Sequence, residues 1–123
     1  SPAPLAGHFT LNFTITNLRF TKDLGTPNSA KFNSSEKIMR HYVERLLQKS
    51  SVGPYFTGCK VTGFRSGRER DETGVDAVCS YRNNISLAGF DREKVYHELS
   101  TMTSGVTKLG HYTLDKNSLY VNG

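Results

Sequence analysis

Within residues His8–Asn17, polar and apolar side chains alternate as far as Thr16. A period of two places the apolar residues on one face of a β-strand and the polar residues on the other. The chain is therefore expected to build a sheet that is covered on one face and open to solvent on the other. The apolar set is Phe9, Leu11, Phe13 and Ile15, and the polar set includes Thr10, Asn12, Thr14 and Thr16.

Two helices are indicated by a capping residue followed by apolar residues that recur every three to four positions. Thr21–Phe32 is polar and is predicted to be a loop, after which a helix is predicted to begin at Asn33. The Asn33 side chain can cap this helix, and Glu36 three residues later completes a capping-box pattern. A second helix is predicted to begin after Asp91, with Gly105 near its end.

The remaining strands define the fold class. Gly58–Arg65 and Thr73–Tyr81 are predicted to pair around the charged loop Ser66–Glu72, and Ser118–Gly123 is predicted to be a short last strand. The order strand, helix, strand, strand, helix, strand is that of the split βαβ arrangement. We therefore predict an α+β fold, a ferredoxin-like α/β sandwich in which helices cover one face of an antiparallel four-stranded sheet. This fold carries many unrelated activities and does not by itself indicate a function.

Length and composition predict one domain. The 123 residues suffice for a single core, and residues 8–123 are assigned to it. Residues 1–7 (SPAPLAG) are small, contain proline and lack periodicity, so they are expected to be a linker. No apolar run approaches the roughly 18 residues of a membrane span, and no signal-type segment opens the sequence. These features predict a soluble module, which can belong to a longer chain.

The formal net charge of +5 permits binding to polyanions. The predicted third strand lacks the interleaved aromatic and basic residues of a nucleic-acid reader, so no nucleic-acid partner is expected. The densest arginine cluster lies in the hairpin loop among acidic residues. A solvated loop is the favoured interpretation, and contact with a polyanion is the alternative. The arginines are Arg65, Arg68 and Arg70, and the acidic residues are Glu69, Asp71 and Glu72.

The cysteines, Cys59 and Cys79, lie on the two strands of the predicted hairpin. If the hairpin turns symmetrically about Glu69, Cys59 faces Cys79 in the same register that places Arg65 opposite Thr73. This placement favours a disulfide, and hence an oxidising compartment, over two buried free thiols.

Three N-x-S/T sequons begin at Asn12, Asn33 and Asn84, and each is predicted to carry an N-glycan. Asn12 belongs to the polar side of the first strand, Asn33 to a helix start and Asn84 to a loop. All three positions can reach solvent, as a glycan requires. The alternatives are a capping role for Asn33, which a glycan does not exclude, and a simple turn residue at Asn84.

No catalytic or metal-binding motif is complete. His97 and Glu98 begin a zinc-protease pattern, but Thr101 occupies the position of the second ligand. The histidines share no metal-ligand spacing, so no enzyme, cofactor or metal is predicted. The competing enzyme hypothesis is a small secreted basic hydrolase that pairs His41 or His111 with a lysine.

Several longer motifs resemble the SEA domain family, and within it the tandem repeats of a membrane mucin. The resemblance covers nearly the whole chain after the linker. It implies a ferredoxin-like fold in a glycosylated extracellular protein, at the cell surface or shed from it. The motifs are LNFTITNL (Leu11–Leu18), the helix start at Asn33, SVGPYFTGC (Ser51–Cys59), TGVDAVC (Thr73–Cys79) and YTLDKNSLYVNG (Tyr112–Gly123).

The family's cysteine pair and its first two glycan sites carry over onto Cys59, Cys79, Asn12 and Asn33, whereas Asn84 is not supported by the resemblance. Many SEA domains cleave themselves where a serine follows a glycine between the second and third strands. The comparable stretch here, Phe64–Arg68, has its serine before the glycine. The resemblance therefore implies an intact, non-catalytic module.

The resemblance also implies partners. Mesothelin and galectin-type lectins would bind through N-glycans, and antibodies to a tumour antigen would recognise repeats of this kind. Membrane contact would come only through the parent chain.

Overall fold

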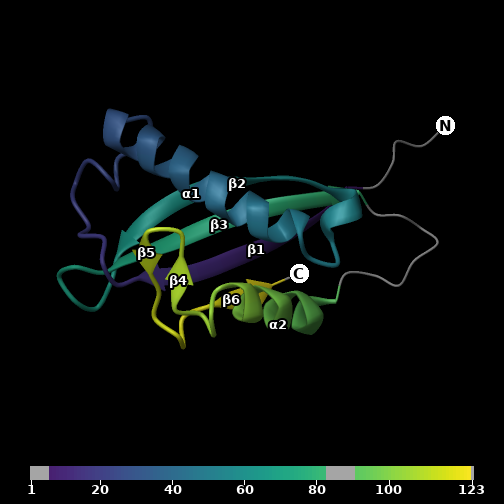
Figure 1. The fold of residues 1–123 in the computed structure, drawn as a ribbon. Coiled ribbons are helices and arrows are strands. Elements are labelled where there is room, and N and C mark those ends of the chain that lie inside the picture. Colours follow the sequence, from purple (N-terminus) through teal and green to yellow (C-terminus); the bar gives the residue numbers. More distant parts are fainter. Residues whose placement is uncertain (1–5, 83–90, 123) are drawn as a thin grey trace.

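The computed structural model describes residues 6–82 and 91–122, and Figure 1 shows their arrangement. A single 3-10 turn, Gly53–Tyr55, joins the first helix to the second strand. The main elements are β1 (Ala6–Ile15), α1 (Ala30–Gln48), β2 (Phe56–Ser66), β3 (Thr73–Arg82), α2 (Arg92–Met102), β4 (Lys108–Leu109), β5 (Tyr112–Thr113) and β6 (Tyr120–Asn122).

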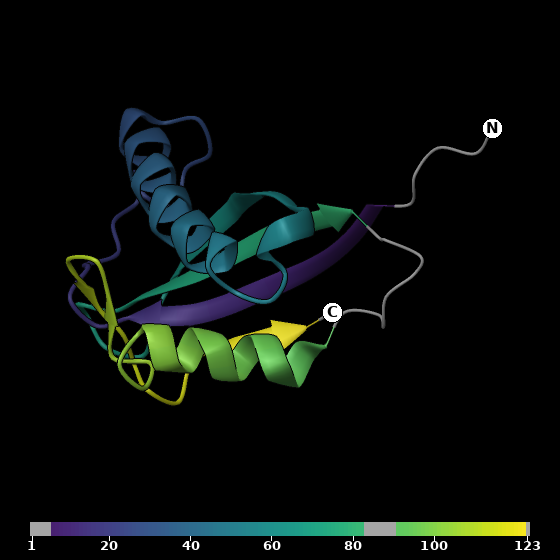
Figure 2. The same cartoon turned by 45° about the vertical axis from the view of Figure 1, so that its right-hand side comes forward.

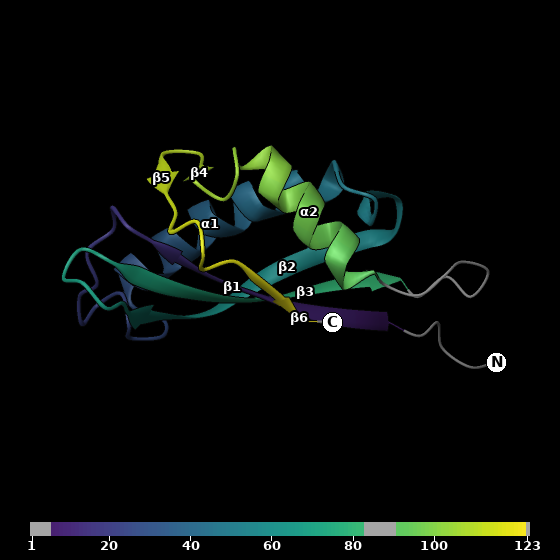
Figure 3. The ribbon, with the colours of Figure 1, turned by 90° about the horizontal axis from the view of Figure 1, so that it is seen from below.

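The strands form a four-stranded sheet in the order β2-β3-β1-β6, and all neighbours are antiparallel. Helix α1 packs over β2, and α2 packs beside β6. Figure 2 shows α2 running alongside β6, and Figure 3 shows both helices on the same side of the sheet. The α+β class and the layer arrangement predicted from the sequence are confirmed.

The core lies between the helices and the covered face of the sheet. The four alternating apolar residues of β1 are at most 4% exposed, so the predicted faces of this strand are confirmed. α1 contributes Met39, Val43 and Leu47 at helical spacing, and α2 contributes Val95 and Leu99.

Helix α1 begins earlier than predicted. Ser29, rather than Asn33, is the N-cap, and its side chain accepts a hydrogen bond from the Phe32 amide at 3.0 Å. Both residue types can cap, and the choice between them depends on packing. The earlier start places Phe32 edge-on against Phe64 of β2, with ring centroids 5.5 Å apart. The predicted cap of the second helix is confirmed, because Asp91 accepts from the Lys94 amide at 3.1 Å.

The register of the β2–β3 hairpin differs from the prediction at its loop end. Cys59 lies opposite Cys79 as expected, but the register shifts by one residue between Val61 and Gly63. Arg65 consequently faces Gly74, and the predicted pairing of Arg65 with Thr73 is wrong. A single extra residue in one strand is the signature of a β-bulge, which the symmetric hairpin assumed from the sequence did not include.

The strand boundaries also differ by a few residues. β1 begins at Ala6, inside the predicted linker, and β6 begins at Tyr120 rather than at Ser118. The two-residue strands β4 and β5 form a separate small hairpin that was not predicted. In the part of the chain that the structure describes, no helix is long and apolar enough to cross a membrane.

Candidate functional site

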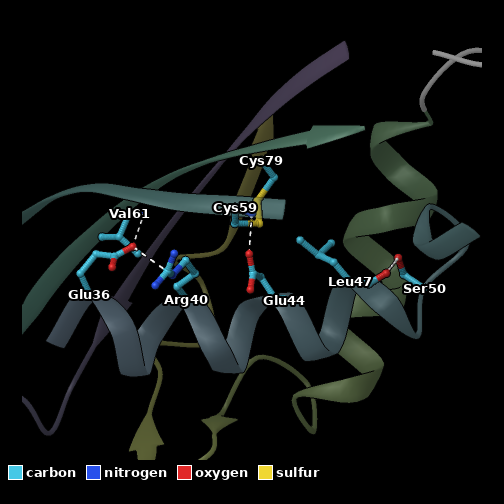
Figure 4. The surroundings of a disulfide bond; sticks show 8 residues. All are labelled: Glu36, Arg40, Glu44, Leu47, Ser50, Cys59, Val61 and Cys79. Atoms are coloured by element: carbon cyan, nitrogen blue, oxygen red, sulfur yellow. Dashed lines mark hydrogen bonds and ion pairs between the residues drawn. A yellow bond between two sulfur atoms is a disulfide. The ribbon is translucent and has the colours of Figure 1, made fainter. Parts of the chain in front are cut away.

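The disulfide between Cys59 and Cys79 is confirmed. Their Cα atoms are 4.0 Å apart on neighbouring strands, and both side chains belong to the core beneath α1. Cys79 is fully buried and Cys59 is 8% exposed. Figure 4 shows the bond lying between the β2–β3 hairpin and the helix.

Helix α1 also covers the free edge of β2, the outer strand of the sheet. Glu44 accepts a hydrogen bond from the Cys59 amide at 2.9 Å, and Glu36 accepts one from the Val61 amide at 3.3 Å. Figure 4 shows both carboxylates directed from the helix toward this strand. Amides on an outer strand otherwise invite pairing with another chain. The two glutamates therefore close this edge beside the disulfide.

The uncovered face of the sheet carries a polar cluster of Asn12, Asp76 and Arg65. Asn12 of β1 lies directly opposite Asp76 of β3, and its amide nitrogen donates to the Asp76 carboxylate. Arg65 of β2 donates to both oxygens of the same carboxylate, with Nε at 2.8 Å and Nη2 at 3.0 Å. On the other side of Asn12, Tyr120 of β6 occupies the opposing position and is 50% exposed.

The hydrogen bond from Arg65 is the main cause that lowers the pKa of Asp76 below its ordinary value. Burial opposes this shift, and the hydrogen bond from Asn12 supports it. The same hydrogen bond raises the pKa of Arg65. The cluster is therefore an ion pair between Arg65 and Asp76, to which the Asn12 side-chain amide adds a hydrogen bond.

Asp76→Asn should remove part of the acid sensitivity of the fold. A carboxyl with a lowered folded-state pKa stabilises the protein above its unfolded pKa of about 4, and that stability is lost as the pH falls through the folded value. The variant should be less stable than the parent by at most about 1 kcal/mol near neutral pH, because the pair is partly solvated. Urea unfolding at several pH values should show the stabilities of the two proteins converging as the pH falls below the ordinary carboxyl pKa of about 4. A difference that is constant with pH would contradict this assignment, and Arg65→Gln should reproduce the effect.

The structure locates two of the three predicted glycan acceptors. Asn12 is half-buried on the uncovered sheet face, and Asn33 is exposed in the first turns of α1. Asn84 lies outside the described residues. Attachment of sugars at these positions stays a prediction.

The three arginines proposed as a polyanion contact do not share one environment. Arg65 is held by Asp76, whereas Arg68 and Arg70 are exposed on the hairpin loop. This loop is closed by backbone hydrogen bonds from Gly67 to Glu72 at 3.1 Å and from Glu72 to Glu69 at 3.2 Å.

The histidines of the hydrolase hypothesis flank an aromatic side chain. The ring centroids of His41 and His111 lie 6.1 and 6.5 Å from that of Tyr42. The Tyr42 ring also packs edge-on against Tyr112, with ring centroids 6.1 Å apart. Burial, with a smaller contribution from Tyr42, raises the pKa of Tyr112. Across the described ranges, no group of three His, Cys, Asp or Glu residues is placed to hold a metal ion.

These features define an α+β module with a core disulfide, a closed sheet edge and a polar sheet face. The family model described as the SEA domain matches residues 8–115, which is most of the chain. The chain belongs to the SEA domain family.

A solved structure shares this fold. It is the full extracellular region of zebrafish Gpr126/Adgrg6, with 16% sequence identity and a TM-score of 0.50. The match covers 98% of this chain and 14% of the zebrafish chain, so this module corresponds to a small part of that protein.

Proposed function

We propose that this chain is a non-catalytic extracellular module of a membrane mucin, similar to the tandem SEA repeats of mucin 16, the carrier of cancer antigen 125. The observation that carries this proposal is the disulfide between Cys59 and Cys79. Such bonds persist in oxidising compartments outside the cytosol. An extracellular location is also supported by SEA family membership and by the matching fold in an extracellular region.

The module acts as a rigid spacer that displays N-glycans in two directions. Asn12 lies on the uncovered face of the sheet, and Asn33 lies in the helical layer on the opposite side. Sugars at these two positions would leave the domain on opposite sides. Galectin-type lectins and mesothelin would bind these sugars, and antibodies to the tumour antigen would bind the protein surface.

The absence of self-cleavage is part of the same proposal. Strain-driven cleavage needs a hydroxyl that is pressed onto a distorted peptide bond. Ser66 instead pairs regularly with Thr73 at the end of the β2–β3 ladder. No residue of the connecting hairpin, 66–73, has a positive φ. This regular backbone supports an intact chain.

Removing the sequons should strongly weaken lectin binding without altering the fold. The background is secreted protein in which Asn84→Gln already removes the third sequon. In this background, Thr14→Ala and Ser35→Ala each remove one further sequon and leave its asparagine in place. Each change should lower galectin binding in part, and together they should lower it by at least about tenfold, as multivalent contacts are lost. Surface plasmon resonance measures the loss.

The matched controls are Thr14→Ser and Ser35→Thr, which keep both sequons and should keep binding. Unchanged lectin binding in the protein that lacks all three sequons would refute glycan display as the function.

A further inference from the structure

The outward side of α1 carries a row of basic residues. Lys37, His41 and Arg45 are four residues apart, Lys49 follows the helix, and all four are exposed. Side chains at this spacing lie above one another on one helix face. With a rise of 1.5 Å per residue, the row from Lys37 to Lys49 is roughly 18 Å long.

Three acidic residues that border this row make hydrogen bonds within the fold. Glu36 and Glu44 accept hydrogen bonds from the β2 backbone, as described above. Glu98 of α2 accepts from the Ser51 amide at 3.0 and 3.2 Å and from its hydroxyl at 2.7 Å. These carboxylates are therefore occupied by structural hydrogen bonds at the margins of the basic row.

The row continues from α1 onto α2. A hollow of about 440 Å³ lies at the end of α1. It is lined in part by Lys49, by Lys94 and His97 of α2, and by Glu98, whose carboxylate is held by Ser51. Within residues 6–82 and 91–122, ion pairs join Arg40 to Glu36 and Arg65 to Asp76, and none includes a cation of the row. We name as the basic stripe the residues Lys37, His41, Arg45, Lys49 and Lys94.

We propose that the basic stripe binds a linear sulfated polysaccharide. Its cations form an extended line, which matches the shape of a linear polyanion better than that of a compact anion. The Arg45 guanidinium can bind a sulfate with two parallel hydrogen bonds, and the lysine ammonium groups act as point charges.

The choice of partner rests on the proposed extracellular location. Anionic lipids are concentrated in the cytoplasmic leaflet, and nucleic-acid readers present aromatic stacking platforms alongside their cations. Among polyanions, the sulfated polysaccharides are the class that an extracellular module meets. Asn33 lies one helical turn before Lys37, so a glycan there would border the basic stripe. The proposed binding itself needs no sugar on the protein, which distinguishes it from the proposed lectin binding.

The test compares two double variants with the same change in net charge. Secreted protein is treated with a glycosidase to remove N-glycans, and its binding to heparin is titrated at several salt concentrations. Lys37→Gln with Arg45→Gln should weaken binding by about tenfold and lower the salt slope by about two, since two ionic contacts are lost. Arg68→Gln with Arg70→Gln is the matched control and should change affinity less than about twofold, because these side chains lie outside the stripe.

Other outcomes would overturn the proposal. Equal losses in the two variants would indicate general charge attraction, and a larger loss in the control would favour the hairpin arginines. Tighter binding to phosphatidylserine vesicles than to heparin would show that the stripe prefers an anionic membrane to a polysaccharide. Lys37→Arg with Arg45→Lys preserves the charges and should bind heparin nearly as well as the parent. Because sugars are removed beforehand, failure here would leave the lectin result unaffected.

Discussion

Replacing Cys59 and Cys79 together with alanine should lower the free energy of unfolding by about 3 kcal/mol. The bond joins residues 20 positions apart, so its loss frees the whole hairpin loop in the unfolded chain. Because both side chains also pack in the core beneath α1, the variant loses contacts there. Calorimetry should show a melting temperature about 10 °C lower and one cooperative transition, since the sheet and helices remain.

The next cross-strand pair of the same hairpin provides the control. Lys60 lies opposite Val78, and neither side chain is buried. Lys60→Ala with Val78→Ala should cost less than about 1 kcal/mol. Reduction of the parent protein should lower its melting temperature toward that of the cysteine variant. A cysteine variant that melts within one or two degrees of the parent would contradict a stabilising bond.

Leu11→Ala should destabilise the protein by about 2–5 kcal/mol, whereas Asn12→Gln should cost about 1 kcal/mol or less. Leu11 is 2% exposed on the covered face of the sheet, so its truncation leaves a cavity. Its neighbour Asn12 lies on the uncovered face, where the change affects one hydrogen bond, to Asp76. Denaturant unfolding of the two variants measures the difference.

This comparison tests which way β1 faces, on which the accessibility of the Asn12 sequon depends. Similar small losses in both variants would show that the packing of Leu11 against the helices is loose. A larger loss for Asn12→Gln than for Leu11→Ala would show that the faces of the strand are reversed.

Short-range sequence patterns correctly predicted the features that depend on neighbouring residues. The alternation in β1 placed its apolar residues correctly, and Asp91 marked the start of α2. The start of α1 was wrong, because Ser29 and Asn33 can both cap. The earlier start is associated with contact between Phe32 and Phe64, which a sequence pattern does not reveal.

The β2–β3 hairpin was likewise predicted in part. The pairing of Cys59 with Cys79 followed from the strand positions, but the shift after Val61 was not predicted. Gly63 inside the strand and the three-residue spacing of the buried Val61 and Phe64 are the signals that could have indicated it. That shift places Arg65 where it reaches Asp76, so the Arg65–Asp76 pair was missed. The small β4–β5 hairpin was missed because strands of two residues are too short to show an alternating pattern.

The candidate site was predicted only in part. Strand alternation indicated that Asn12 faces away from the helices, and the structure agrees. The carboxylates of Glu36 and Glu44 close the edge of β2 through contacts between segments that are distant in sequence. Glu36 was instead interpreted as part of a capping box. Only the packed structure reveals such contacts.

Mass analysis of the intact protein and its glycopeptides, after secretion from mammalian cells, tests the central claim most directly. The claim is that this chain is an uncleaved, disulfide-bonded glycoprotein module. The account predicts one uncleaved chain, a bond between Cys59 and Cys79, and sugars on Asn12 and Asn33. Two free thiols together with unmodified Asn12 and Asn33, or fragments divided within the β2–β3 hairpin, would contradict it.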